Sequence, residues 1–193
     1  MKVETKRFLI KFVRDVIENF VKSETILDIP KNYPEELKLK RGVFVTLYKK
    51  EKDEEALRGC IGLPYPTQSL IQNLREAAIG ATQDPRFEKL KEEELEDLVI
   101  EISVLNEPKK IEVKKPEQCL SKIECHKDGL IIKKGLRSGL FLPQVWEQLP
   151  DKREFLLNLC LKAGLSPHEW KSDGTILYKF QVEVIRESEL DKS

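Results

Sequence analysis

Residues 43–62 read VFVTLYKKEKDEEALRGCIG. The run at 43–49 is rich in β-branched and aromatic residues, a charged turn follows at 49–55, and a second run carries Arg58 and Cys60. Two strand-like runs joined by a polar turn predict a β-hairpin. Any site that the second run contributes is therefore expected on a strand.

The second run ends in LRGCIG, which places one thiol between two glycines with an arginine two residues before it. Residues two apart in a strand point to the same face, so Arg58 and Cys60 are expected side by side. Gly59 and Gly62 carry no Cβ and let a backbone or a ligand come close. A guanidinium near a thiol favours the thiolate, the nucleophilic form. The segment therefore predicts a ligand-binding site.

Helices and alternating strands surround this hairpin. Apolar residues recur at helical spacing over 6–22, with Thr5 as the expected N-cap. A second helix is expected from a cap at Thr67 to about Thr82. Apolar and polar residues alternate over 176–184. Because helices and half-polar strands intermix, we predict an α+β fold with largely antiparallel sheets.

The composition narrows the class of protein. The chain has 193 residues, 40% of them hydrophobic, and its 34 basic and 34 acidic residues give zero net charge. A neutral chain argues against strong nonspecific binding of nucleic acid. No signal peptide and no apolar run of about 20 residues is evident, so a soluble cytoplasmic protein is expected, with no membrane. Abundant lysine and glutamate with one methionine are typical of thermophiles.

Cys60 is the sharpest catalytic candidate, as a nucleophile or as a thiol that contacts a ligand. The alternative is a small buried residue of a tight hairpin. A cysteine nucleophile usually needs a base, and neither His126 nor His168 is near it in sequence. Glu101, on a strand expected over 99–105, is the candidate base. No metal site or cofactor is expected, since metal-ligand spacing and nucleotide-binding loops are missing. Free thiols are expected rather than disulfides, because the chain is neither short nor visibly secreted.

Three arginines form a candidate anion-binding set: Arg58, Arg86 and Arg137. The planar guanidinium suits phosphate or carboxylate, and Arg137 lies in a glycine turn with Ser138, which joins the ligand-binding set. Asp84 joins it as well, to orient the ligand or to serve in proton transfer. The alternative for each arginine is an ordinary ion pair with a carboxylate.

Asp84 and Arg86 reach the site only under one condition. They follow the helix at 67–82, which is on the order of 20 Å long. They therefore meet Cys60 only if this helix crosses back along the sheet.

Several segments resemble one known family in the right order along nearly the whole chain. These are LRGCIG (57–62), TQSLIQNLREAA (67–78), DPRF (84–87), EISVL (101–105), GLRSGLFLPQV (135–145) and LCLKAGL (159–165). Together they resemble the AMME-syndrome critical-region protein family, or AMMECR-like family. No biochemical activity is established for that family. Its prokaryotic members are associated with Memo-like and radical SAM proteins, which suggests modification chemistry.

The resemblance implies a single AMMECR-like domain of two compact lobes, with the signature near a cleft. We expect the larger lobe at 1–107 plus 165–193 and the smaller at 108–164. The leading hypothesis is a ligand cleft around Cys60 that binds an anionic small molecule and supports a Cys-dependent reaction. One alternative is a non-catalytic module that binds a protein partner. A weaker alternative is an RNA-binding or RNA-modifying factor.

Overall fold

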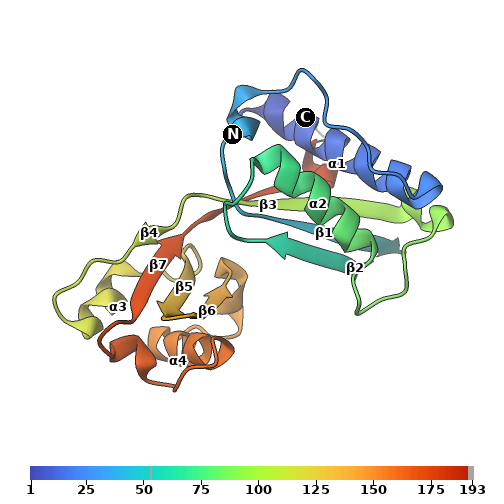
Figure 1. Cartoon of the computed structure of the whole chain (residues 1–193). Helices are drawn as coiled ribbons and strands as arrows, with labels where there is room; N and C mark the ends of the chain where they lie inside the picture. Colours follow the sequence, from blue (N-terminus) through green and yellow to red (C-terminus); the bar gives the residue numbers. More distant parts are fainter. Residues whose placement is uncertain (53, 191–193) are drawn as a thin grey trace. The chain divides into compact units, whose positions relative to one another are not determined.

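The computed structural model describes residues 1–52 and 54–190. The chain divides into two compact units (Figure 1): unit 1 comprises Met1–Val104 and Glu183–Ser193, and unit 2 comprises Leu105–Val182. Each unit combines helices with a four-stranded sheet. The pairs β1–β2, β1–β3, β4–β7, β5–β6 and β5–β7 are all antiparallel. The predicted α+β class is confirmed.

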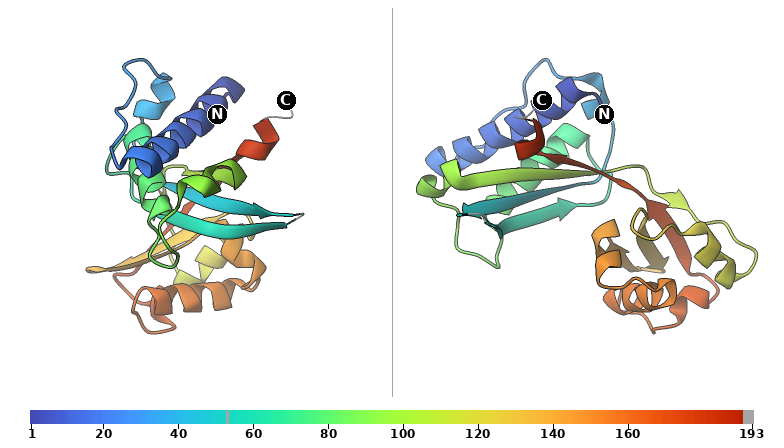
Figure 2. Two further views of the ribbon diagram at one scale, coloured as in Figure 1. Left: turned by 90° about the vertical axis from the view of Figure 1, so that its right-hand side faces the viewer. Right: turned by 180° about the vertical axis from the view of Figure 1, so that it is seen from behind.

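Unit 1 contains two long helices and a sheet in the order β2-β1-β3-β8. Its elements are α1 (Val3–Ser23), β1 (Val43–Glu51), β2 (Glu54–Leu63), α2 (Leu70–Thr82), β3 (Leu98–Leu105), β8 (Val182–Arg186) and α5 (Glu187–Leu190), with 3-10 turns η1 (Glu35–Lys38) and η2 (Glu92–Asp97). Figure 2 shows α1 and α2 on the same side of this sheet. The predicted hairpin is β1–β2, which leaves β2 at the sheet edge.

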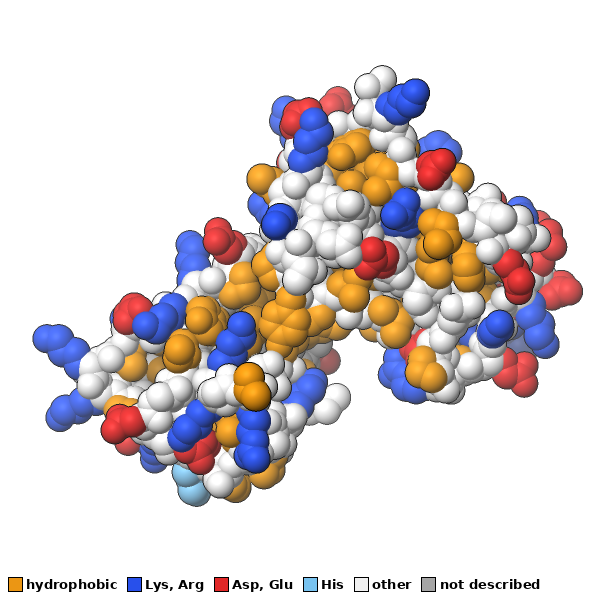
Figure 3. All heavy atoms as spheres, viewed as in Figure 1, with side chains coloured by type: hydrophobic (Ala, Val, Ile, Leu, Met, Phe, Trp, Pro, Cys, Tyr) orange, Lys and Arg blue, Asp and Glu red, His pale blue; other side chains and the backbone are white. Residues whose placement is uncertain are grey.

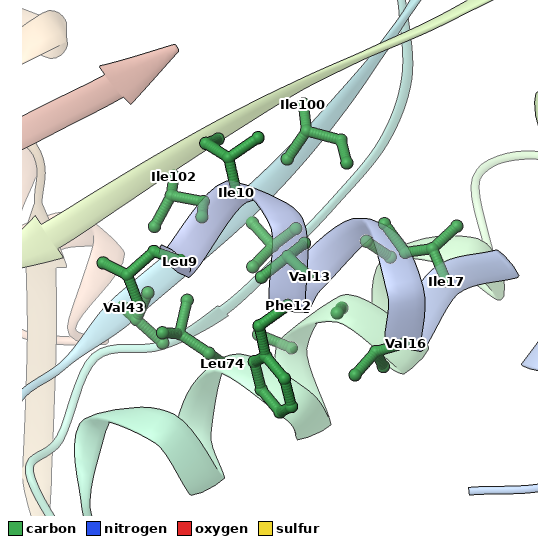
Figure 4. Close-up of a cluster of buried hydrophobic side chains, with 14 of the residues drawn as sticks. Leu9, Ile10, Phe12, Val13, Val16, Ile17, Val43, Leu74, Ile100 and Ile102 are labelled. Atoms are coloured by element: carbon green, nitrogen blue, oxygen red, sulfur yellow. The ribbon is translucent and has the colours of Figure 1, made fainter. Parts of the chain in front are cut away.

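The core of unit 1 lies between α1, α2 and the sheet (Figure 4). On α1, Leu9, Val13, Val16 and Ile17 recur at helical spacing and are at most 1% exposed. Burial of side chains of this size stabilises the fold by about 2 kcal/mol each. The amphipathic helix predicted over 6–22 is confirmed.

Both predicted helix caps were placed wrongly. The first helix begins at Val3, and Thr5 lies inside it, buried. The second begins at Leu70 after Ser69, whose backbone N–H donates to Gln72 Oε1 at 3.1 Å. Ser69 rather than Thr67 is the N-cap, because Gln72, three residues after Ser69, accepts a hydrogen bond from the Ser69 N–H.

Unit 2 contains a sheet in the order β4-β7-β5-β6. Its elements are β4 (Lys109–Lys110), α3 (Cys119–Lys122), β5 (Gly129–Lys134), β6 (Arg137–Phe141), α4 (Lys152–Lys162) and β7 (Ile176–Phe180), with 3-10 turns η3 (Pro116–Gln118), η4 (Pro143–Glu147) and η5 (Glu169–Lys171). Trp146 stacks on Phe155 in its core, with 3.7 Å between ring centroids. Buried Asp128 accepts hydrogen bonds from Lys179 Nζ and Gln181 Nε2.

The division of the chain differs from the expected one at both boundaries, slightly at the first, where unit 2 begins at Leu105 rather than at 108, and more at the second. The sequence placed residues 165–182 in the larger lobe, but they belong to unit 2. The reason is pairing: β7 lies between β5 and β4 and is hydrogen-bonded to both. The chain returns to unit 1 only with β8.

Charged side chains of both signs occur on the face of each unit that is visible in Figure 3. This mixture agrees with the equal numbers of basic and acidic residues. Within residues 1–52 and 54–190, no helix is both long enough and apolar enough to cross a bilayer.

Candidate functional site

Cys60 belongs to a row of polar side chains across three strands of unit 1. It stands opposite Thr46 of β1, which in turn stands opposite Glu101 of β3. Side chains at directly opposed positions share one face of an antiparallel sheet. The neighbouring β1 residues Val45 and Leu47 are fully buried in the helix-covered core. The row Cys60–Thr46–Glu101 therefore lies on the face turned away from α1 and α2.

Both the backbone and the side chain of Cys60 are held in place. Its N–H donates to Asp84 Oδ2 at 2.9 Å, and Thr46 Oγ1 donates to its Sγ at 3.3 Å. The N–H thus points away from β1, so Cys60 and Thr46 form a non-hydrogen-bonded pair, the kind whose side chains are closest. Cys60 itself remains partly exposed.

Asp84 anchors the edge strand through a charged network. It is 3% exposed. Its Oδ1 accepts from Arg86 N at 3.0 Å and Nε at 3.1 Å, and its Oδ2 from Arg86 Nη2 at 2.7 Å. These bonds hold the pKa of Asp84 well below its usual range, although burial acts in the opposite direction. The ionised Asp84 carboxylate therefore fixes the position of the Cys60 peptide. Because Asp84 follows α2, this contact also means that α2 crosses back along the sheet, as the sequence required.

The two glycines of the signature make room for protein groups. A Cβ on Gly59 would lie 2.2 Å from the carbonyl oxygen of Ala81 at the end of α2. A Cβ on Gly62 would lie 2.1 Å from the Phe44 ring. Real Cβ atoms essentially never come this close, so Gly59, which faces a backbone atom, requires glycine, and a side chain at position 62 would require the Phe44 ring to move. Gly59 and Gly62 therefore have a packing role, and their contact with a ligand stays a prediction.

Arg58 does not share a face with Cys60 as the alternation predicted. A bulge in β2 puts Leu57, not Arg58, opposite Tyr48. The Arg58 guanidinium instead forms two bonds to Glu94, from Nε and Nη2, both at 2.9 Å. Such a planar, two-bond pair is a stable arrangement for arginine and a carboxylate. Arg58 is therefore an ion-pair partner of η2.

Glu94→Gln is expected to reduce the free energy of unfolding by about 1–2 kcal/mol at neutral pH. Arg58 lowers the pKa of Glu94 from 4.5 to about 2. A carboxyl with a lower pKa in the folded chain stabilises the fold above its unfolded pKa, and that stabilisation disappears as pH falls from about 4.5 toward 2. Urea unfolding across this range measures the difference between variant and wild type.

The control is Glu92→Gln, an exposed residue of the same turn, which is expected to change stability by less than about 0.5 kcal/mol. A Glu94→Gln effect that persists unchanged at low pH would contradict the ionic origin.

Glu101, the predicted base, is mostly buried on the same face as Cys60. Its side chain is 16% exposed, and burial raises its pKa although Arg186 lies 3.7 Å away. Arg186 also pairs with Glu55 and lies over the Tyr48 ring. Two strand spacings, about 10 Å, separate Glu101 from Cys60. This separation is too large for direct proton transfer between the two side chains.

Arg137 and Ser138 are the remaining predicted ligand-binding residues, and they lie on β6 of unit 2. Arg137 Nη1 donates to the carbonyl oxygen of Gly164 at 2.6 Å, within the same unit. Ser138 stands opposite Lys133 of β5. Arg137 and Ser138 are therefore not part of the Cys60–Thr46–Glu101 row of unit 1.

All four cysteines are free. Cys119 and Cys160 are buried, and burial raises the pKa of each thiol. Cys60 and Cys125 are the two partly exposed thiols. Across residues 1–52 and 54–190, no group of three or more His, Cys, Asp or Glu side chains could hold a metal ion.

Four residues around the site were not singled out from the sequence: Thr46, Tyr48, Glu94 and Arg186. A signal existed for Thr46 and Tyr48, because alternation in 43–49 places them on one face of the hairpin. No local pattern could pair Glu94 with Arg58, or Arg186 with Glu101, because these partners are far apart in the sequence.

Known proteins match this chain over most of its length. The AMMECR1 family model matches residues 10–185. Protein MJ0810 of Methanocaldococcus jannaschii is 42% identical over 191 residues, covering 98% of this chain and 93% of the relative. Protein PH0010 of Pyrococcus horikoshii is 44% identical over 192 residues, covering 97% and 92%. Both sources are thermophilic archaea, which agrees with the composition.

The fold has a solved counterpart. The "Crystal Structure of Uncharacterized Protein PH0010 From Pyrococcus horikoshii" matches with a TM-score of 0.82 at 43% identity, covering 95% of this chain and 92% of that one. The family model spans most of the chain, and the relatives match nearly end to end. The chain therefore belongs to the AMMECR1 family.

Proposed function

We propose that the sheet face carrying Cys60, Thr46 and Glu101 binds a small ligand, with the Cys60 thiol as nucleophile. One observation carries this proposal: the Cys60 peptide is anchored to the buried Asp84 carboxylate, while its partly exposed sulfur accepts a hydroxyl hydrogen bond. A fixed backbone, an accessible sulfur and a hydroxyl donor to that sulfur favour a nucleophilic thiol, since the donor stabilises negative charge on the sulfur.

Glu101 has a different role from the base first considered. Because about 10 Å separates it from Cys60, it serves the ligand rather than the thiol. A ligand lying across β1 would reach the sulfur at one end and the Glu101 carboxyl at the other. Burial raises the pKa of Glu101, and its carboxyl oxygens can accept hydrogen bonds from the ligand.

The charge of the ligand is open to a direct test. Two of the three arginines expected to hold an anion are engaged with carboxylates, Arg58 with Glu94 and Arg86 with Asp84. The third, Arg137, belongs to unit 2 and donates to the Gly164 carbonyl oxygen. An anionic ligand would compete for Arg186, which is bound to Glu55 and Glu101. A neutral or cationic ligand faces no such competition.

Alkylation with three probes of different charge tests the proposal. Iodoacetamide is neutral, iodoacetate is anionic and 2-bromoethylamine is cationic. Peptide mass spectrometry follows Cys60 and the internal reference Cys125 in the same sample. We expect Cys60 to react, and Glu101→Gln to change its preference among the probes without changing that of Cys125. If Cys60 did not react in the folded protein, the proposal that its thiol is a nucleophile would be overturned.

Thr46→Val is expected to slow alkylation of Cys60 about fivefold, because it removes the hydroxyl donor to sulfur, a bond worth roughly 1 kcal/mol. The rate at Cys125 should not change. Equal rates at Cys60 in the variant and the wild type would show that this hydrogen bond does not support reactivity.

The second candidate is a protein-interaction surface on the same face. Leu57 and Val184 are large, exposed apolar residues of its strands β2 and β8. Memo-like and radical SAM proteins are the partners to test, by co-purification with wild type and Leu57→Asp. Val3→Asp, an exposed position on α1, is the control. Partner binding with an unreactive Cys60 would favour this candidate.

A further inference from the structure

Unit 2 contains a pocket of about 210 Å³, formed by residues 111–119 and 170–177. Ile111, Cys119, Trp170 and Leu177 form its base, and the polar residues Ser172 and Thr175 also line it. Each of the four residues of the base is itself at most 7% exposed. The pocket lies within unit 2, so it is a feature separate from the Cys60 row.

The rim of this pocket carries opposite charges. Lys114 comes from one wall and Asp173 from the other, and both are exposed. Neither residue forms an ion pair among those found in the described part of the chain. Each charge is therefore available to a bound molecule.

The two walls are joined to each other, so the pocket is preformed. The N–H of Ile111 donates to the carbonyl oxygen of Leu177 at 2.8 Å. On the other side, Lys171 of η5 lies 3.9 Å from Glu117 of η3. A preformed pocket spares the ligand the entropic cost of ordering the walls.

The thiol in the base contributes as an apolar group. Burial raises the pKa of Cys119 to about 11, so its thiol stays protonated at neutral pH. A protonated, buried thiol is neither a nucleophile nor a metal ligand. The Cys119 thiol therefore adds an uncharged, apolar group to the base of the pocket.

We propose that this pocket binds a small zwitterion with a branched apolar side chain, the chemistry of a free aliphatic amino acid. The side chain lies on Trp170 and Leu177, the carboxylate faces Lys114 and the ammonium faces Asp173. The volume equals that of about seven waters at roughly 30 Å³ each, well below the range of about 300–1,000 Å³ for drug-sized ligands. A molecule of leucine's size matches it.

Three probes separate the chemical contributions: L-leucine, 4-methylpentanoate, which lacks the amino group, and 3-methylbutylamine, which lacks the carboxylate. Trp170 fluorescence reports binding, since Trp146 is fully buried outside the pocket. We expect leucine to bind at least about tenfold more tightly than either analogue. Equal affinities for leucine and 4-methylpentanoate would overturn the proposal that the pocket recognises a zwitterion. If none of the three probes bound, the proposal that this pocket is a ligand site would be overturned.

Variants of the rim supply the residue-level test. Lys114→Met should weaken leucine about tenfold and leave 3-methylbutylamine unchanged. Asp173→Asn should weaken leucine and leave 4-methylpentanoate unchanged. The control Lys115→Met alters the neighbouring exposed lysine, which does not line the pocket. Loss of leucine binding in Lys115→Met to the same extent would overturn the assignment to Lys114.

Discussion

Gly59→Ala is expected to reduce the free energy of unfolding by about 3 kcal/mol, at the upper end for an overpacked site. The new Cβ would lie 2.2 Å from the Ala81 carbonyl oxygen, a backbone atom that cannot move aside like a flexible side chain. The edge strand must then move away from α2, which also strains the Cys60 N–H bond to Asp84. Urea unfolding followed by far-ultraviolet circular dichroism measures the loss.

Gly80→Ala is the matched control. Its Cβ would lie 3.1 Å from Ile61 Cγ2, a side-chain atom that can give by a few tenths of an ångström. Alanine inside a helix gains about 0.5–1 kcal/mol over glycine. The control is therefore expected to be close to neutral, and a Gly59→Ala protein as stable as Gly80→Ala would contradict the close approach of β2 and α2.

Asp84→Ala is expected to reduce the free energy of unfolding by about 2–3 kcal/mol at neutral pH. It leaves the backbone N–H groups of Cys60 and Arg86 without their acceptor. The Arg86 guanidinium is largely exposed and finds water instead, so little of the loss arises there. The same variant should alter the alkylation rate of Cys60, because its peptide is no longer anchored.

The pH dependence of this effect identifies the carboxylate. The pKa of Asp84 is lower in the folded chain than in the unfolded one. Its stabilisation is therefore complete above the unfolded pKa of about 3.9 and is lost progressively as pH falls below it. The stability gap between wild type and Asp84→Ala should narrow in this acidic range.

Asp15→Ala is the control for Asp84→Ala, since Asp15 forms an exposed pair with Lys11 on α1. Its effect should stay below about 0.5 kcal/mol. A gap for Asp84→Ala that remains constant into strong acid would show that the carboxylate charge does not stabilise the fold.

Much of the fold follows from local patterns. The helical spacing of Leu9, Val13 and Val16 predicts a helix with one buried face, and these three residues are buried on α1. The two strand-like runs at 43–62 form the predicted hairpin. Caps were less predictable, because Ser69 and Thr67 are both good capping residues and only the contact with Gln72 distinguishes them.

The candidate site was predictable only in part. LRGCIG and the following DPRF segment identified Cys60 and Asp84, and the structure brings their atoms within 2.9 Å. Arg58 was misplaced because a single bulged residue changes which side chains share a face of the strand. Nothing local distinguishes a bulge at Arg58 from regular alternation.

Local periodicity was thus enough to assign the class of fold and the hairpin, because period and residue type act over a few neighbouring positions. The row Cys60–Thr46–Glu101 and the pairing of Arg58 with Glu94 needed the folded chain, because they depend on register and on contacts between distant segments. Such contacts form only where their gain exceeds the entropy lost in closing long loops, a balance set by the whole structure.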